Sequence, residues 1–264
     1  MNSINAGKVI LAGAGPGDAE LITVKLQKRL AEADVIIADR LVNPLIISSY
    51  ASKDAMVIIA GKKGFDENSF SQDEVTALII EHAVQGKTVL RLKGGDIAFF
   101  SNVLDELDAL IKNNIPYEII PGITAASGAS AYAGIPLTAR GFSQGVQFLT
   151  FNPKSHYRPA KWKSLADTND TLVFYMASKN IDDLVELLSR YTKNLNTALA
   201  VIEQASTAHQ QVHLSTLKNV AKDFDGNSFS SPSLIIVGEV VNLHNRFKWF
   251  IDSLPGSVFP ELEK

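Results

Sequence analysis

The chain has 264 residues, of which 46% are hydrophobic and 20% charged, with a formal net charge of −3 and an isoelectric point near 6.0. This balance gives no global basic field of the kind that nucleic-acid-binding proteins carry, so an anionic ligand must be met by local clusters of cations. The absence of cysteine excludes disulfides and thiolate metal sites, and no apolar run has the length that spans a bilayer. We therefore expect a globular, cytoplasmic protein, long enough for two domains, that binds neither nucleic acid nor membrane.

The first 120 residues alternate short apolar runs with stretches of helical periodicity. Such alternation is typical of a parallel sheet covered by helices. The predicted strands are 8–12, 34–38, 56–60, 87–92 and 117–120, and the predicted helices are 20–32, 43–51, 71–85 and 101–113.

The pattern changes after this point, where a stretch rich in small residues spans 124–132 and β-rich segments follow Arg140. We therefore divide the chain into domains of residues 1–123 and 124–264. The segments of the second domain are strands 145–151, 171–176, 197–202, 210–215 and 233–237, one clear helix at 180–191, and a polar loop or short helix within 152–170.

The turns that follow the predicted parallel strands are the first place to seek a site, because ligands bind at the carboxyl ends of such strands. Each of the five turns carries glycine, charge or both. Any one of them has an ordinary explanation as loop chemistry, but five at one sheet edge favour a binding site. They are Gly13–Asp18, Asp39-Arg40, Gly61–Gly64, Lys93–Asp96 and Pro121–Thr124.

The first turn reads Gly-Ala-Gly-Pro-Gly-Asp over residues 13–18. Its glycines remove Cβ atoms that would keep a ligand off the backbone. The dinucleotide fingerprint spaces its glycines differently, and Pro16 offers no amide donor. Because Asp18 would repel a pyrophosphate, the turn favours a neutral or cationic ligand.

Two charged turns are candidates for substrate chemistry. Asp39 and Arg40 directly follow an apolar strand, where they can orient a charged substrate, and Asp39 can accept a proton if burial raises its pKa. An aspartate that merely caps the next helix is the alternative. Lys62 and Lys63 lie between two glycines; each alone fits a solvent-facing loop residue, but with Arg40, Lys93 and Arg140 they can form a cationic rim for a polyanionic small molecule.

Several other chemistries are disfavoured. The five histidines lack metal-ligand spacing with acids, so we expect no metal site. The chain also lacks Gly-x-Ser-x-Gly and the Walker loop, which disfavours acyl and phosphoryl transfer.

Taken together, the motifs closely resemble those of uroporphyrinogen-III C-methyltransferases in the tetrapyrrole methylase superfamily. The resemblance runs from about residue 8 to 243. It is carried by Gly13–Asp18, Asp39–Val42, Gly61-Lys62, Leu92–Asp96, Pro121–Gly128, Gly134–Thr138, Val173–Met176 and Val237–Val240.

The resemblance implies two α/β domains, the first with a mostly parallel sheet and the second with a mixed sheet, and S-adenosylmethionine bound in the cleft between them. It also implies a homodimer that transfers methyl groups to two pyrrole carbons of uroporphyrinogen III. The product would be precorrin-2, on the route to sirohaem or cobalamin, and S-adenosylhomocysteine would be released.

The resemblance also implies roles for particular residues. Asp39 would be the proton acceptor and Lys62 the proton donor, while Arg40, Lys63, Lys93, Asn102 and Arg140 would face the substrate. The residues implied for the cofactor site are Pro16, Gly94, Gly95, Asp96, Phe99, Thr124, Ala125, Met176 and Ala205.

Departures from the family pattern gather on the substrate side. Asn102 stands where the family has an arginine, Ala139 replaces a histidine, and segment 65–72 lacks the usual histidine and proline. Two alternatives therefore stay open beside uroporphyrinogen-III methylation: a divergent paralogue with another acceptor, and a non-catalytic cofactor-binding protein. A nicotinamide-dependent oxidoreductase fits less well, because the third glycine of its fingerprint is misplaced.

Overall fold

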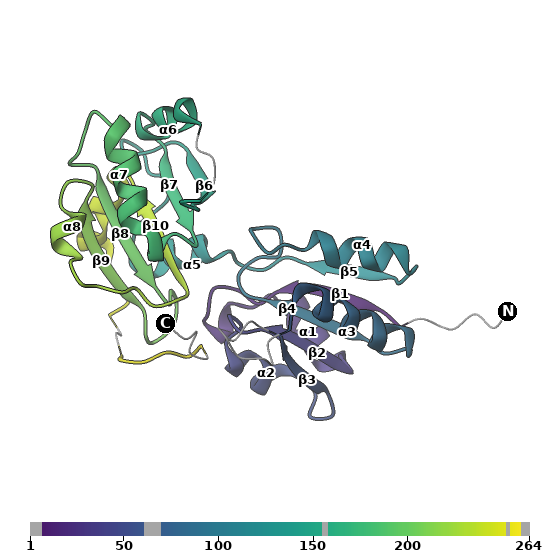
Figure 1. The fold of residues 1–264 in the computed structure, drawn as a ribbon. Coiled ribbons are helices and arrows are strands. Elements are labelled where there is room, and N and C mark those ends of the chain that lie inside the picture. Colours follow the sequence, from purple (N-terminus) through teal and green to yellow (C-terminus); the bar gives the residue numbers. More distant parts are fainter. Residues whose placement is uncertain (1–6, 61–69, 155–157, 252–253, 260–264) are drawn as a thin grey trace. The chain divides into compact units, whose positions relative to one another are not determined.

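The computed structural model describes residues 7–60, 70–154, 158–251 and 254–259 (Figure 1). They divide into two compact units between residues 125 and 126, with residues 257–259 belonging to the first unit. Each unit is built on one five-stranded sheet. Within the described residues no helix is long and apolar enough to cross a membrane.

The first unit is a sheet of order β3-β2-β4-β1-β5 in which every pairing is parallel. The carboxyl ends of its strands therefore share one edge, as the sequence predicted. Its elements are β1 (Val9–Gly13), the 3-10 helix η1 (Ala19–Leu21), α1 (Val24–Glu32), β2 (Val35–Asp39), α2 (Pro44–Tyr50), β3 (Met56–Ala60), α3 (Gln72–Val84), β4 (Val89–Lys93), α4 (Leu104–Lys112) and β5 (Tyr117–Ile120).

Side-chain hydrogen bonds at the helix starts explain several boundaries. The predicted helix 20–32 is in fact two, because Asp18 caps η1 and Thr23 separately caps α1. Ser71 and Glu74 form a reciprocal capping box at the start of α3.

Helices cover both faces of the first sheet. Leu26 and Leu30 of α1 pack with Ile10, while Ile79 of α3 packs with Leu11 on the other face. Neighbouring strand residues point to opposite faces, so the apolar strands supply two cores at once.

The second unit is a mixed sheet of order β6-β7-β10-β8-β9. The β6–β7 pair is parallel, whereas β10 runs antiparallel to both β7 and β8, and β9 runs antiparallel to β8. Its elements are α5 (Ala125–Ala133, whose first residue falls in the first unit), β6 (Val146–Thr150), α6 (Pro159–Ala166), β7 (Thr171–Tyr175), η2 (Ser178–Asn180), α7 (Ile181–Tyr191), β8 (Ala198–Glu203), β9 (Gln211–Thr216), α8 (Val220–Asp223), β10 (Ser233–Val237), η3 (Glu239–Leu243) and α9 (His244–Phe247).

Helices α6 and α7 build the core of this unit. The ring of Trp162 stacks on Phe174 of β7 at a centroid distance of 6.4 Å, and Leu184 and Leu188 of α7 join the same cluster. The polar segment 152–170 therefore contains a helix anchored by its one tryptophan. The short helices α8, η3 and α9 were not predicted, because each is too brief to display helical periodicity.

Candidate cofactor and substrate site

The turns at the strand ends of the first unit are joined by main-chain and side-chain hydrogen bonds. Gly15 N donates to Gly95 O at 3.0 Å and Gly95 N donates to Gly15 O at 2.8 Å. Asp96 Oδ2 accepts a hydrogen bond from Gly122 N at 2.7 Å, and Asn43 Nδ2 donates to Gly17 O at 2.7 Å. The turns after β1, β2, β4 and β5 thus form one interlocked edge. The turn after β3, with the predicted Lys62 and Lys63, lies outside the described residues.

Gly13 and Gly15 of the first turn allow this close packing of backbone rather than ligand access. A Cβ on Gly13 would lie 2.5 Å from Gly95 O and 2.9 Å from Gly122 N, and one on Gly15 would lie 2.8 Å from Leu21 O. These positions are closed by protein backbone, which corrects the expectation that they admit a ligand. Gly95 differs, because a Cβ there would come no closer than 3.6 Å, to Ala125 N, although its φ of +70° still favours glycine.

The predicted cofactor residues of the first unit divide by exposure. Asp96 is only 7% exposed, and its Oδ1 accepts a hydrogen bond from Ala98 N at 2.7 Å, so its carboxylate organises the turn. Pro16 is buried, whereas Phe99 is exposed. Gly94, Thr124 and Ala125 are of intermediate exposure.

Asp39 is held from behind by a buried guanidinium. Arg91 of β4 is 2% exposed; its Nη2 contacts Asp39 Oδ1, and its Nε donates to Glu106 Oε1 at 3.0 Å. The Asp39 side chain is 33% exposed and so can meet a ligand. The helix-capping alternative for Asp39 is wrong, because Asn43 caps α2 by accepting a hydrogen bond from Leu45 N at 3.0 Å.

The predicted cationic rim needs correction in the first unit. Lys93 is buried, with Nζ 2.7 Å from Ser101 O and 3.1 Å from Glu106 Oε2, and Arg40 is also buried at 9% exposure. The side-chain period of two along β4 places Lys93 on the same inner face as Arg91, so its charge serves the fold.

Two further residues predicted to face the substrate are exposed. Arg140 belongs to the turn that Ala139 and Ser143 close in the second unit. Asn102 precedes α4 with φ +49°, and its Nδ2 lies 3.4 Å from Asp105 Oδ2.

Sequence reasoning missed Arg91 and Glu106. A signal was present, because an arginine interrupts the otherwise apolar start of Val-Leu-Arg-Leu-Lys at 89–93. A charge in a buried strand requires a buried partner.

Strained backbone marks the corresponding edge of the second sheet. Strands β7 and β8 point the same way, since both are antiparallel to β10. Met176 follows β7 with φ +55° and is 65% exposed, while Gln204 and Ser206 follow β8 with φ +46° and +64°. Ala205 lies between them and is 8% exposed. Left-handed conformations cost non-glycine residues energy and cluster at ligand sites, so they single out the turns of Met176 and Ala205.

The end of β8 is fixed by a carboxylate with partners on two other segments. Glu203 Oε2 lies 2.6 Å from His213 Nε2, and its Oε1 accepts a hydrogen bond from Ser230 Oγ at 2.7 Å. Burial opposes ionisation, but these hydrogen bonds outweigh it and lower the pKa of Glu203. The anchored carboxylate directly precedes the Gln204–Ser206 turn.

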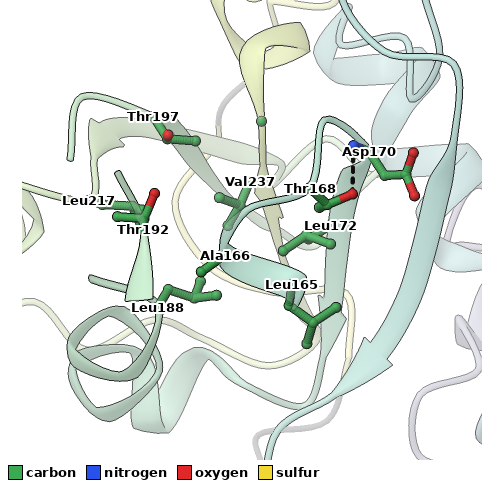
Figure 2. A pocket seen from close by; sticks show the side chains of 11 residues that line it. Leu165, Ala166, Thr168, Asp170, Leu172, Leu188, Thr192, Thr197, Leu217 and Val237 are labelled. Carbon is green, nitrogen blue, oxygen red and sulfur yellow. Dashed lines mark hydrogen bonds between the residues drawn. The ribbon is translucent and has the colours of Figure 1, made fainter. Parts of the chain in front are cut away.

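A small pocket of about 40 Å³ lies at the opposite edge of the second sheet. Leu172 and Val237 line it together with Thr197, and Figure 2 shows the hydrogen bond from Asp170 N to Thr168 Oγ1, 3.1 Å long, beside it. This volume is well below the roughly 300 Å³ that small-molecule sites occupy. Because it lies at the starts of β7 and β8, the pocket is also separate from the Met176 and Ala205 turns at the ends of those strands.

The comparisons with known proteins agree with this arrangement. The model of the Tetrapyrrole (Corrin/Porphyrin) Methylases matches residues 8–221. The chain belongs to this family. This match confirms the methyltransferase family that the motifs indicated. The two five-stranded sheets confirm the expected fold of two α/β domains. Within the described residues, no group of three or more histidines and acids could hold a metal ion.

The curated proteins similar to this chain include siroheme synthases. Those of Pseudomonas aeruginosa and Actinobacillus succinogenes are each 41% identical, over 247 and 244 residues. These matches cover 94% and 92% of the chain but only 53% and 50% of the relatives. The chain thus spans about half the length of these curated relatives.

Solved structures match over nearly their whole length. A uroporphyrin-III-C-methyltransferase from Thermus thermophilus is 30% identical with a TM-score of 0.75, covering 94% of this chain and 99% of that one. A structure of the Thermus thermophilus enzyme complexed with S-adenyl homocysteine is 31% identical with a TM-score of 0.75, and covers 90% of this chain and all of that one. A cobalt precorrin-4 methyltransferase has a TM-score of 0.79 at 23% identity, a likeness of fold alone.

Proposed function

We propose that this family member is a uroporphyrinogen-III C-methyltransferase that uses S-adenosylmethionine and forms precorrin-2. The observation that carries the proposal is the partly exposed Asp39, held by Arg91 at the edge where the turns of the first sheet interlock. The choice of acceptor and cofactor is supported by the Thermus thermophilus uroporphyrin-III C-methyltransferase and its complex with S-adenyl homocysteine, each of which covers at least 90% of this chain.

The residues at the strand ends fit such a cofactor. The exposed Met176 and the Ala205 turn offer strained backbone in the second unit, and Gly95 offers a position without a Cβ in the first. No basic phosphate-binding loop is required, because a sulfonium is cationic. When bound, S-adenosylmethionine supplies an electrophilic methyl group to the pyrrole carbon, with S-adenosylhomocysteine leaving.

The chain's own residues then align the acceptor and move a proton. The pyrrole carbon is already nucleophilic; forming its bond to the methyl group leaves a cationic ring system that must lose a proton. Arg91 orients Asp39 through Oδ1, and within the described part of the chain Oδ2 accepts no hydrogen bond. Asp39 would take that proton, and we propose Lys62 as the proton donor, as the resemblance implies.

The negative charge of the proposed acceptor accounts for the cationic side chains of Arg140, Lys62 and Lys63. A tetrapyrrole with eight carboxylates is matched by exposed Arg140 and by Lys62 and Lys63. Asn102 carries no charge, and the loss of one bidentate arginine contact to a carboxylate costs on the order of 1.5–3 kcal/mol. We therefore keep a divergent acceptor as a second candidate, since Asn102 is exposed beside Asp105.

One experiment separates these candidates. The purified protein is incubated anaerobically with enzymatically generated uroporphyrinogen III and S-adenosylmethionine, and product mass is followed for one or two added methyl groups. Two additions support the proposal. No addition, with calorimetric binding of S-adenosylhomocysteine retained, favours another acceptor or a non-catalytic protein. Sedimentation of the same sample tests the homodimer that the resemblance implies.

A further inference from the structure

The first turn of α4 carries a carboxylate shielded completely from water. The Glu106 side chain is 0% exposed. Its Oε1 accepts hydrogen bonds from Arg91 Nε at 3.0 Å and from Gln72 Nε2 at 3.2 Å. Its Oε2 lies 3.1 Å from Lys93 Nζ, an ion pair without hydrogen-bond geometry. Burying a carboxylate this deeply is costly unless paired cations and hydrogen bonds offset its desolvation, as they do here.

Arg91 connects this buried carboxylate to Asp39. A guanidinium is planar and rigid, so fixing one of its nitrogens fixes the direction of the others. Glu106 holds Nε, the carbonyls of Ile37 and Leu92 lie 3.2 and 3.3 Å from Nη1, and Nη2 is left to contact Asp39. Asp39 is the most exposed of the four charged side chains, at 33% against 4% or less for the others.

The charges of the cluster balance. Arg91 and Lys93 bring two positive charges, and Glu106 and Asp39 bring two negative ones. Without the Glu106 charge, two buried cations would face one carboxylate, and Lys93 would retain, among the described residues, only its hydrogen bond to the Ser101 carbonyl. The guanidinium would then lose the contact that sets its plane.

We propose that Glu106 is a positioning residue for the proton-accepting Asp39, acting through Arg91. This inference rests on the proposed function, in which Asp39 takes the proton after methyl transfer. Glu106 touches neither substrate nor cofactor in this scheme; it sets the orientation of the Asp39 carboxylate. Small displacements of a reacting group can cost about 100-fold in rate.

The test compares Glu106→Gln with the wild-type enzyme acting on uroporphyrinogen III. The variant preserves side-chain shape but removes the charge. We expect kcat to fall about 10- to 100-fold, with KM for uroporphyrinogen III and Kd for S-adenosylhomocysteine each changing less than about twofold. Glu118→Gln is the matched control, because Glu118 also binds several cations. It should lower Tm without lowering kcat.

A double-mutant cycle with Asp39→Asn distinguishes positioning from a general loss of structure. If Glu106 acts through Asp39, then Glu106→Gln lowers kcat no further in the Asp39→Asn background. Should Glu106→Gln fail to fold, Arg91→Lys replaces it. Lysine keeps the positive charge but lacks the planar guanidinium that contacts both Glu106 and Asp39.

The outcomes are distinguishable. An active wild type whose Glu106→Gln variant retains full kcat, or whose two substitutions are additive, overturns the positioning role and leaves the proposed function intact. A folded wild type that methylates no uroporphyrinogen III contradicts the proposed function itself.

Discussion

The Asn43 side chain joins two turns of the first sheet by donating from Nδ2 to the carbonyl of Gly17 at 2.7 Å. Its Oδ1 simultaneously accepts a hydrogen bond from Leu45 N at 3.0 Å and so caps α2. One buried amide therefore fixes the start of a helix and the position of the Gly13–Asp18 turn.

Replacing Asn43 should reveal both contacts. Asn43→Ala removes the cap and leaves Gly17 O without this donor, so we expect the free energy of unfolding to fall by about 1–3 kcal/mol. Asn43→Asp retains the cap but cannot donate to Gly17 O. Urea unfolding of the two variants separates the contributions; equal stability of Asn43→Asp and wild type would contradict the role of the Gly17 contact.

Asp39→Asn should abolish most of the methyl-transfer turnover while leaving cofactor binding intact. The amide keeps the size of the side chain but cannot accept the proton, a contribution that is typically worth about 10²- to 10⁴-fold in rate. Turnover is measured by product mass and binding by calorimetry with S-adenosylhomocysteine. The exposed Asp54→Asn is the control and should behave as wild type. Unchanged turnover in Asp39→Asn would remove Asp39 from the mechanism.

Met176→Gly should weaken ligand binding without lowering Tm. Glycine adopts φ +55° at little cost, so relief of strain should offset the extra entropy of the unfolded chain and leave Tm near that of wild type. The exposed thioether is lost, and S-adenosylhomocysteine should bind at least about tenfold more weakly. Asn114→Gly, at φ +53° in the first unit, is the control for backbone relief and should bind the ligand normally. Undiminished binding by Met176→Gly would argue against a cofactor contact there.

Glu118 should make stability depend on acid. Lys25, Lys8 and Arg29 all contact its carboxylate and lower its pKa from 4.5 to about 2. A folded-state pKa below the unfolded value stabilises the fold above pH 4.5, and this contribution is lost as the pH falls from 4.5 towards 2. Tm should therefore fall more steeply over this interval in wild type than in Glu118→Gln. Parallel Tm curves for the two proteins would show that the ion pairs contribute nothing.

The sequence predicted the two sheets better than it predicted which charged residues are buried and how they pair. The strands were found because apolar runs of four to six residues bounded by turn residues are local signals. The pairing of Arg91 with Glu106 joins residues 15 positions apart and depends on how α4 packs over β4, which no local pattern contains. The positive φ of Met176 could not be predicted either, since methionine has no preference for that backbone conformation.

The reciprocal hydrogen bonds between Gly15 and Gly95 use only main-chain atoms. That one link therefore does not depend on any side chain, whereas the side chains of Asn43 and Asp96 hold the neighbouring turns. A library aimed at new acceptors would therefore randomise the exposed Asn102 and Arg140, and it would leave Gly13, Gly15, Asn43, Gly95, Asp96 and Gly122 unchanged.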